Sequence, residues 1–145
     1  MLRTALLHPD ISAALGRAGH GSKVLLADAN FPAATKLGPN AELVHLNLAP
    51  GLVSATDILR VLVQAIPIEA AEVMTSGEGA EPEIFAEFRE ILKDSVTFDR
   101  DHVELTMHDR FTFYDVAEAP DVALTIQTGE QRIYANLLLT IGVVL

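Results

Sequence analysis

Short apolar runs typical of buried strands alternate along this chain with segments whose apolar residues recur at helical spacing, and this alternation limits the possible folds most. Strands are predicted at residues 23–27, 42–48, 69–75, 102–107, 122–127 and 136–143. Helices are predicted at 9–18, 54–66, 82–92 and 110–117. Strands that alternate with helices favour an α/β domain that contains parallel strand pairs.

The size of the chain limits how many domains it can form, and its charge limits which partners it can bind. Its 145 residues are 50% hydrophobic and show no linker or repeat, so we expect a single domain over residues 1–145. A formal net charge of −10 disfavours nucleic acid and anionic membrane surfaces. No apolar stretch reaches the roughly 20 residues that span a bilayer, so no membrane segment is predicted.

The absence of cysteine excludes a disulfide framework, a thiolate zinc site and a cysteine nucleophile. Together with a start that lacks the apolar stretch of a signal peptide, it favours a cytoplasmic location. The sequence ends on two valines and Leu145, and we expect these side chains to pack into the domain or against a partner subunit.

Two residues that flank the first predicted strand are candidates for chemistry. His20 stands between two glycines, and histidine is the side chain whose ordinary pKa is closest to neutrality, so it could act as a general acid or base. The alternative is a solvent-exposed histidine at a helix end. Asp28 follows the carboxyl end of this strand, the place where ligands of α/β sheets bind. It could accept hydrogen bonds from sugar hydroxyls, or it could stabilise a turn.

Two later segments carry groups that suit a sugar. Arg110 precedes Phe111-Thr112-Phe113-Tyr114, a cation beside aromatic rings, although a helix with core phenylalanines explains the same letters. Tyr134-Ala135-Asn136 offers a phenol and an amide, each able to donate and accept hydrogen bonds. The combination is compatible with binding of a polyhydroxylated ligand.

Other motifs favour no further chemistry. His102, Glu104, Thr106 and His108 fall on one face of a predicted strand and could ligate a metal, but an exposed sheet face explains them equally well. No HExxH, GxGxxG or GxSxG motif is present, so we predict no metal site, no nucleotide-binding loop and no serine nucleophile elbow.

In order along the chain, these pieces resemble the ribose pyranase/fucose mutarotase family. The resemblance rests on AGHGSKVLLADANFPA at residues 18–33, HDRFTFY at 108–114 and TGEQRIYANLLLTIGV at 128–143. It implies a three-layer α/β/α domain with a largely parallel, mixed sheet. It also implies a homo-oligomeric ring, commonly a decamer, with sites at subunit boundaries, and interconversion of cyclic forms of a free monosaccharide without cofactor or metal.

The resemblance also implies roles for single residues. His20 would be the proton donor, and Tyr134 is a second candidate for proton transfer. The residues that would hold the sugar are Asp28, His108, Arg110, Tyr134, Ala135 through its backbone, and Asn136. RFxFY and DAxFP resemble fucose-type members, whereas His108 and YAN resemble ribose-type members, so the sugar stays open. The alternative function is a non-catalytic sugar-binding or regulatory protein of carbohydrate uptake.

Overall fold

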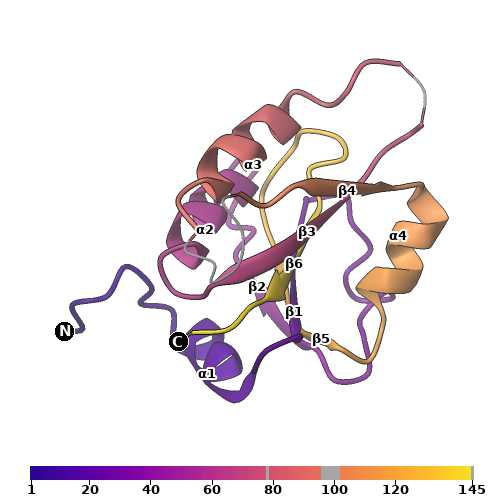
Figure 1. The fold of residues 1–145 in the computed structure, drawn as a ribbon. Helices are drawn as coiled ribbons and strands as arrows, with labels where there is room; N and C mark the ends of the chain where they lie inside the picture. The colour runs from indigo at the N-terminus through magenta and orange to yellow at the C-terminus, as the bar shows by residue number, and fades with distance from the viewer. Residues whose placement is uncertain (78, 96–101, 145) are drawn as a thin grey trace.

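A computed structural model describes residues 1–77, 79–95 and 102–144, and its centre is a six-stranded sheet (Figure 1). The strands are β1 (Lys23–Ala27), β2 (Glu42–His45), β3 (Ile68–Met74), β4 (Leu105–His108), β5 (Val122–Gln127) and β6 (Leu137–Ile141), in the order β2-β5-β1-β6-β3-β4. Strand β6 is antiparallel to both of its neighbours, and the other three pairs are parallel. The expected mixed, largely parallel sheet is confirmed.

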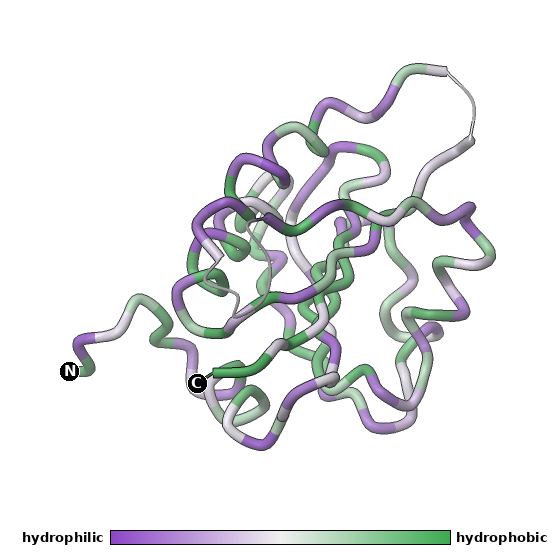
Figure 2. Tube along the Cα trace, in the orientation of Figure 1, coloured by the Kyte–Doolittle hydropathy of each residue, from purple (hydrophilic) through white to green (hydrophobic). Residues whose placement is uncertain are grey.

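Helices cover both faces of this sheet. Helices α1 (Pro9–Arg17), α2 (Ala55–Leu62) and α3 (Ile84–Leu92) pack on one face, and α4 (Arg110–Ala117) packs on the other (Figure 1). Hydrophobic residues concentrate in the strands and on the helix sides that meet them (Figure 2). The expected three-layer α/β/α architecture is therefore confirmed.

Local sequence signals explain where these helices begin. Pro9 opens α1, a position where the missing N–H removes no helical hydrogen bond. At α2, the Asp57 N–H donates to Ser54 Oγ at 3.1 Å and the Ser54 N–H donates to Asp57 Oδ2 at 3.2 Å, so the capping box is complete. Asp109 caps α4 by accepting hydrogen bonds from two backbone N–H groups of its first turn.

Three of the differences from the sequence prediction concern β2, β4 and the C-terminus. Strand β2 ends at His45 instead of residue 48, because the chain turns there into the loop that contacts residue 129. Strand β4 begins at Leu105, so His102 and Glu104 precede it and the predicted four-residue face is wrong. Val144 is 80% exposed, so the C-terminus is not packed into this domain, and Leu145 lies outside the described residues.

No helix within the described ranges is long and apolar enough to cross a membrane.

Candidate functional site

A pocket of about 280 Å³ lies beyond the carboxyl ends of β1 and β3. The start of β6 and the start of α4, which follows β4, also contribute to it. Four of the residues expected to bind a sugar line it: Asp28, Arg110, Tyr134 and Asn136. Its other lining residues are Asn30, Phe31, Met74, Tyr114 and Ile133. Parallel strands bring their carboxyl ends to the same side of a sheet, and antiparallel β6 begins there, which is why segments about 80 to 110 positions apart in sequence meet here.

Asp28 and Asn136 form the polar floor of this pocket. Their backbone segments are neighbours because β1 and β6 are antiparallel, with Leu26 opposite Leu137. The Asn136 side-chain Nδ2–H donates to Asp28 Oδ2 at 2.9 Å, and the Asp28 backbone N–H donates to Asn136 Oδ1 at 2.9 Å. Both residues are buried. This reciprocal pair fixes the orientation of both side chains.

The electrostatics of Asp28 reflect its burial. Desolvation raises the pKa of the Asp28 carboxyl above its ordinary value of 3.8. Hydrogen bonds from the backbone N–H groups of Asn30 and Phe31, from the Asn136 side chain and from the backbone of Ala135 oppose that shift. Ala135 is fully buried, so its contribution to the site is made by its backbone. Both carboxylate oxygens are held by donors, Oδ1 by the Asn30 N–H and Oδ2 by the Asn136 Nδ2–H, and a carboxylate has further acceptor sites for a ligand hydroxyl.

Tyr134 reaches the pocket from a strained backbone. Its φ of 60° is in the left-handed region, which a non-glycine residue rarely adopts. Such conformations persist where the surrounding structure imposes them, and they concentrate at functional sites. The segment 128–136, which carries Tyr134, must therefore be held firmly.

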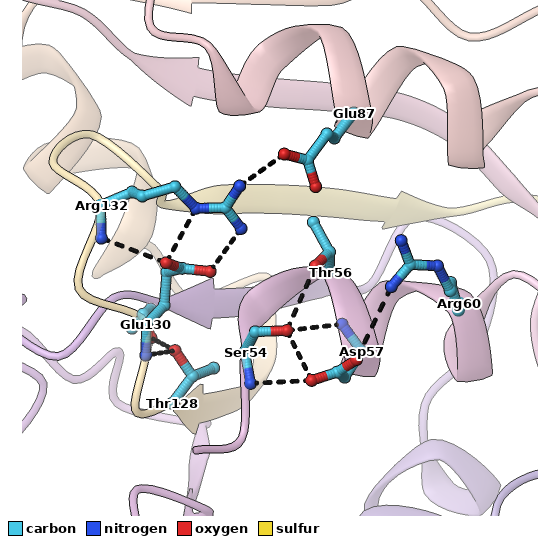
Figure 3. Close-up of polar contacts among 9 residues, drawn as sticks. Ser54, Thr56, Asp57, Arg60, Glu87, Thr128, Glu130 and Arg132 are labelled. Atoms are coloured by element: carbon cyan, nitrogen blue, oxygen red, sulfur yellow. Dashed lines mark hydrogen bonds and ion pairs between the residues drawn. The ribbon is translucent and has the colours of Figure 1, made fainter. Parts of the chain in front are cut away.

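An ion-pair network holds this segment (Figure 3). Buried Glu130 accepts from Arg132 Nε at 3.0 Å, from Nη2 at 2.8 Å and from the Arg132 backbone N–H at 3.1 Å. Arg132 Nη1 also donates to Glu87 of α3 at 2.5 Å. The guanidinium lowers the pKa of the Glu130 carboxyl below its ordinary range. Arg132 thereby ties the Tyr134 segment to α3.

Close backbone packing holds the start of the same segment. The Gly129 N–H donates to the Val53 carbonyl at 2.9 Å, and the Gly51 N–H donates to the Gly129 carbonyl at 2.7 Å. A Cβ on Gly129 would lie 2.0 Å from the Leu52 carbonyl oxygen, so only glycine fits. Sequence reasoning quoted TGEQR but missed this role, because the contacts join positions about 75 residues apart.

Arg110 and two aromatic rings, those of Phe31 and Tyr114, also line the pocket. Arg110 is the first residue of α4, and Tyr114 follows one helical turn later on the same side. The Phe31 and Tyr114 rings meet edge to face with centroids 5.6 Å apart. Sequence reasoning grouped Tyr114 with Arg110 as groups that suit a sugar, but it did not single out Phe31, although DAxFP contains it.

His108 does not line this pocket. Its Nε2 lies 2.7 Å from Glu72 Oε2, and Lys23 Nζ lies 3.1 Å from Glu72 Oε1. These three side chains form a mostly buried cluster of ionisable groups on the α4 face of the sheet. The structure therefore separates His108 from the other expected sugar-binding residues in this conformation.

His20 lies near the amino end of β1, opposite to the end that carries Asp28. It precedes β1, whereas Asp28 follows it, and five strand residues span about 16 Å. His20 borders a second pocket of about 500 Å³ together with Arg17, Ser22, Glu42 and Asp121. Its side chain is 59% exposed, and its Nε2 lies 3.2 Å from each carboxylate oxygen of Glu69. One copy of the chain does not bring His20 to the Asp28 pocket.

Within the described ranges, no group of three or more His, Asp or Glu residues is arranged to hold a metal ion.

Comparison with known proteins adds relatives along the full length. Residues 1–144 match the model of the RbsD / FucU transport protein family. A D-ribose pyranase of Clostridium perfringens is 28% identical over 144 residues, which cover 99% of each chain. The structure of RbsD from Bacillus subtilis complexed with D-ribose is 26% identical, with a TM-score of 0.73 and complete coverage of both chains. A fucose mutarotase from Streptococcus pneumoniae, solved with L-fucose, is 24% identical with complete coverage and a TM-score of 0.82, a likeness of fold.

Proposed function

Since this chain belongs to the RbsD / FucU transport protein family, we propose that it is a monosaccharide mutarotase, an isomerase that needs no cofactor. It interconverts the anomers, and the pyranose and furanose forms, of a free sugar such as L-fucose or D-ribose. The names of the D-ribose pyranase relative and of the two sugar complexes support this activity.

The observation that carries the proposal is the composition of the Asp28 pocket. A buried carboxylate, a buried amide and a guanidinium together supply acceptors and donors for hydroxyl groups. The edge-to-face rings of Phe31 and Tyr114 offer an apolar surface for the C–H groups of a sugar. A volume of about 280 Å³ matches a ligand of monosaccharide size.

The reaction moves two protons and leaves the sugar neutral. An acid delivers a proton to the ring oxygen as the bond from that oxygen to the anomeric carbon breaks, and a base removes the proton of the anomeric hydroxyl. The open-chain aldehyde then closes on its other face or through another hydroxyl. We assign the acid to His20 and propose the Tyr134 phenol for the second transfer, while Asp28, Arg110 and Asn136 hold hydroxyls.

A second copy of the chain must supply His20, because β1 separates it from Asp28 within one copy. Two exposed apolar side chains support such an association: Ile133, which lines the pocket, is 69% exposed, and Phe111, which follows Arg110, is 76% exposed. We therefore propose a homo-oligomer with sites at subunit boundaries, as a decameric ring would provide. A cytoplasmic location stays a prediction.

Saturation-transfer NMR on L-fucose and D-ribose tests the activity. We expect faster anomer exchange with the protein than in buffer for at least one sugar, and loss of the acceleration in His20→Ala. Exchange at the buffer rate for both sugars, despite binding, would support the non-catalytic alternative. The exchange rates for D-ribose and L-fucose also show which sugar the protein prefers. His108 and residues 134–136 favour ribose, whereas RFxFY and DAxFP favour fucose.

Mixing two inactive variants tests the shared site. His20→Ala and Arg110→Ala each remove one half of the proposed site, so subunits exchanged between the two should reassemble intact sites and regain part of the activity. Activity that stays absent after verified subunit exchange would show that both halves act within one chain. A monomer by size-exclusion chromatography would contradict the shared site directly.

A further inference from the structure

We propose that Glu69 is a positioning residue for His20: its carboxylate holds the imidazole through Nε2 and leaves Nδ1 to exchange a proton with the sugar. This inference rests on the proposed mutarotase function. It adds a residue outside the sugar pocket, on β3, to the groups that serve the reaction.

The contact joins two segments that are 49 positions apart. His20 Nε2 lies 3.2 Å from Glu69 Oε1 and 3.2 Å from Oε2, so the ring nitrogen faces both oxygens of the carboxylate. The two side chains are 59% and 37% exposed, which leaves the other side of the imidazole open to a ligand or a second copy. A carboxylate accepts hydrogen bonds only, so Nε2 must be the donor of this pair.

The backbone directs Glu69 to this position. The register between β3 and β6 shifts between Ile68 and Ala70, so Glu69 stands at an irregularity of the ladder. Irregularities of this kind re-aim a side chain and recur beside active sites. Directly after β6, a Cβ at Gly142 would lie 3.3 Å from Glu69 Cβ and 3.5 Å from Oε2, so the glycine leaves the space that the Glu69 side chain fills.

The segment that carries His20 is anchored to the same strand end. The Gly21 N–H donates to the Ile141 carbonyl at 2.9 Å, and the Gly142 N–H donates to the Pro67 carbonyl at 2.9 Å. The end of β6 therefore joins the backbone next to the imidazole to the backbone next to the carboxylate. Their relative position is set by main-chain hydrogen bonds and does not depend on the side-chain contact alone.

The arrangement suits a proton donor. In the imidazolium form both ring nitrogens carry a proton: Nε2–H stays on Glu69 while Nδ1–H is given to the ring oxygen of the sugar. Afterwards the neutral imidazole keeps its Nε2–H on the carboxylate, and Nδ1 is free to accept a proton when the ring closes. The Glu69 carboxylate accepts from Nε2–H in both forms and stabilises the imidazolium, as the carboxylate does in other histidine–carboxylate pairs.

Two substitutions separate orientation from charge. Glu69→Ala removes both, and we expect a fall in kcat of about tenfold or more with a KM within about twofold of wild type. Glu69→Gln keeps an oxygen that can accept from Nε2–H but loses the charge, so its kcat should lie between those of the wild type and of Glu69→Ala. Glu90→Gln, an exposed glutamate on α3, is the matched control and should keep wild-type kcat. Far-UV circular dichroism and urea unfolding verify that each variant is folded.

Chemical rescue tests whether Glu69 acts through His20. Formate should restore part of the kcat of Glu69→Ala, because the exposed pair is open to a small carboxylate. The double variant His20→Ala/Glu69→Ala in the same formate concentration measures the direct effect of formate on the sugar and should show no further gain. Wild-type kcat in Glu69→Ala, a loss confined to KM, or equal rescue in the double variant would overturn the inference. Absence of acceleration by the wild-type protein would instead overturn the proposed function.

Discussion

Replacement of Asn136 by alanine probes the polar floor of the pocket. It removes the Nδ2–H bond to the Asp28 carboxylate, and it leaves the buried Asp28 N–H without its acceptor. A hydrogen bond to a charged group contributes about 1.5–3 kcal/mol, and a stranded buried donor costs about 1–3 kcal/mol. Water that enters from the adjoining pocket offsets part of this, so we expect the free energy of unfolding to fall by about 2–4 kcal/mol at pH 7.

The loss should grow with pH. Burial raises the folded-state pKa of Asp28 above 3.8, so this group contributes stability below that pH and loses it as the pH rises through the folded-state value. Asn136 lowers this folded-state pKa, so the alanine variant carries a larger upward shift and loses more stability over the same rise. The difference from wild type should therefore be larger at pH 7 than at pH 4.

Urea unfolding followed by far-UV circular dichroism measures both effects, at one fixed protein concentration because association shifts apparent stability. The control is Asn40→Ala. Asn40 donates its Nδ2–H to the Pro120 carbonyl at 2.8 Å on the exposed surface, and its removal should cost less than about 1 kcal/mol. A loss below about 1 kcal/mol for Asn136→Ala at pH 7, or a loss that is the same at both pH values, would refute the reasoning.

Three further changes test the site and its supports. Sugar affinity, measured by titration, should weaken on acidification at a pH above the ordinary range of an aspartate, because burial raises the pKa of Asp28; an Asp28→Asn variant should lack this dependence. Arg132→Met should lower the free energy of unfolding by about 1–3 kcal/mol and raise KM by loosening the segment 128–136, whereas an unchanged KM would contradict that support. Gly129→Ala should lower the free energy of unfolding by about 3 kcal/mol or more in thermal or urea unfolding, because its Cβ would meet the Leu52 carbonyl. Gly16→Ala in α1, with open space around it, should raise the free energy of unfolding by about 0.5–1 kcal/mol. A Gly16→Ala variant less stable than Gly129→Ala would refute the packing argument.

Local patterns predicted the elements because the physical causes are local. Helix periodicity and the Ser54–Asp57 capping box act within a few residues, and both appear in α2 as expected. The start of β4 was wrong by three residues: the alternation begins at His102, but pairing with β3 begins only at Leu105, opposite Ala71, although β3 itself starts at Ile68. Strand ends depend on the neighbouring strand, which no local pattern contains.

The sequence likewise predicted one part of the candidate site and missed another. Residue types and motif order identified Asp28, Arg110, Tyr134 and Asn136, and these line one pocket. The support from Arg132 and Glu130, and the pairing of Glu69 with His20, could not be predicted, because both depend on contacts across strands and helices.

By itself the sequence determined the α/β class, the helices and the chemical groups available, since periodicity and side-chain chemistry are properties of the chain. Only the tertiary structure decided which of these groups meet. The direction of β1 places Asp28 in the 280 Å³ pocket at the carboxyl end of the strand and His20 near its amino end. That distance is the reason why a second copy enters the proposed site, and it follows from strand geometry that no motif expresses.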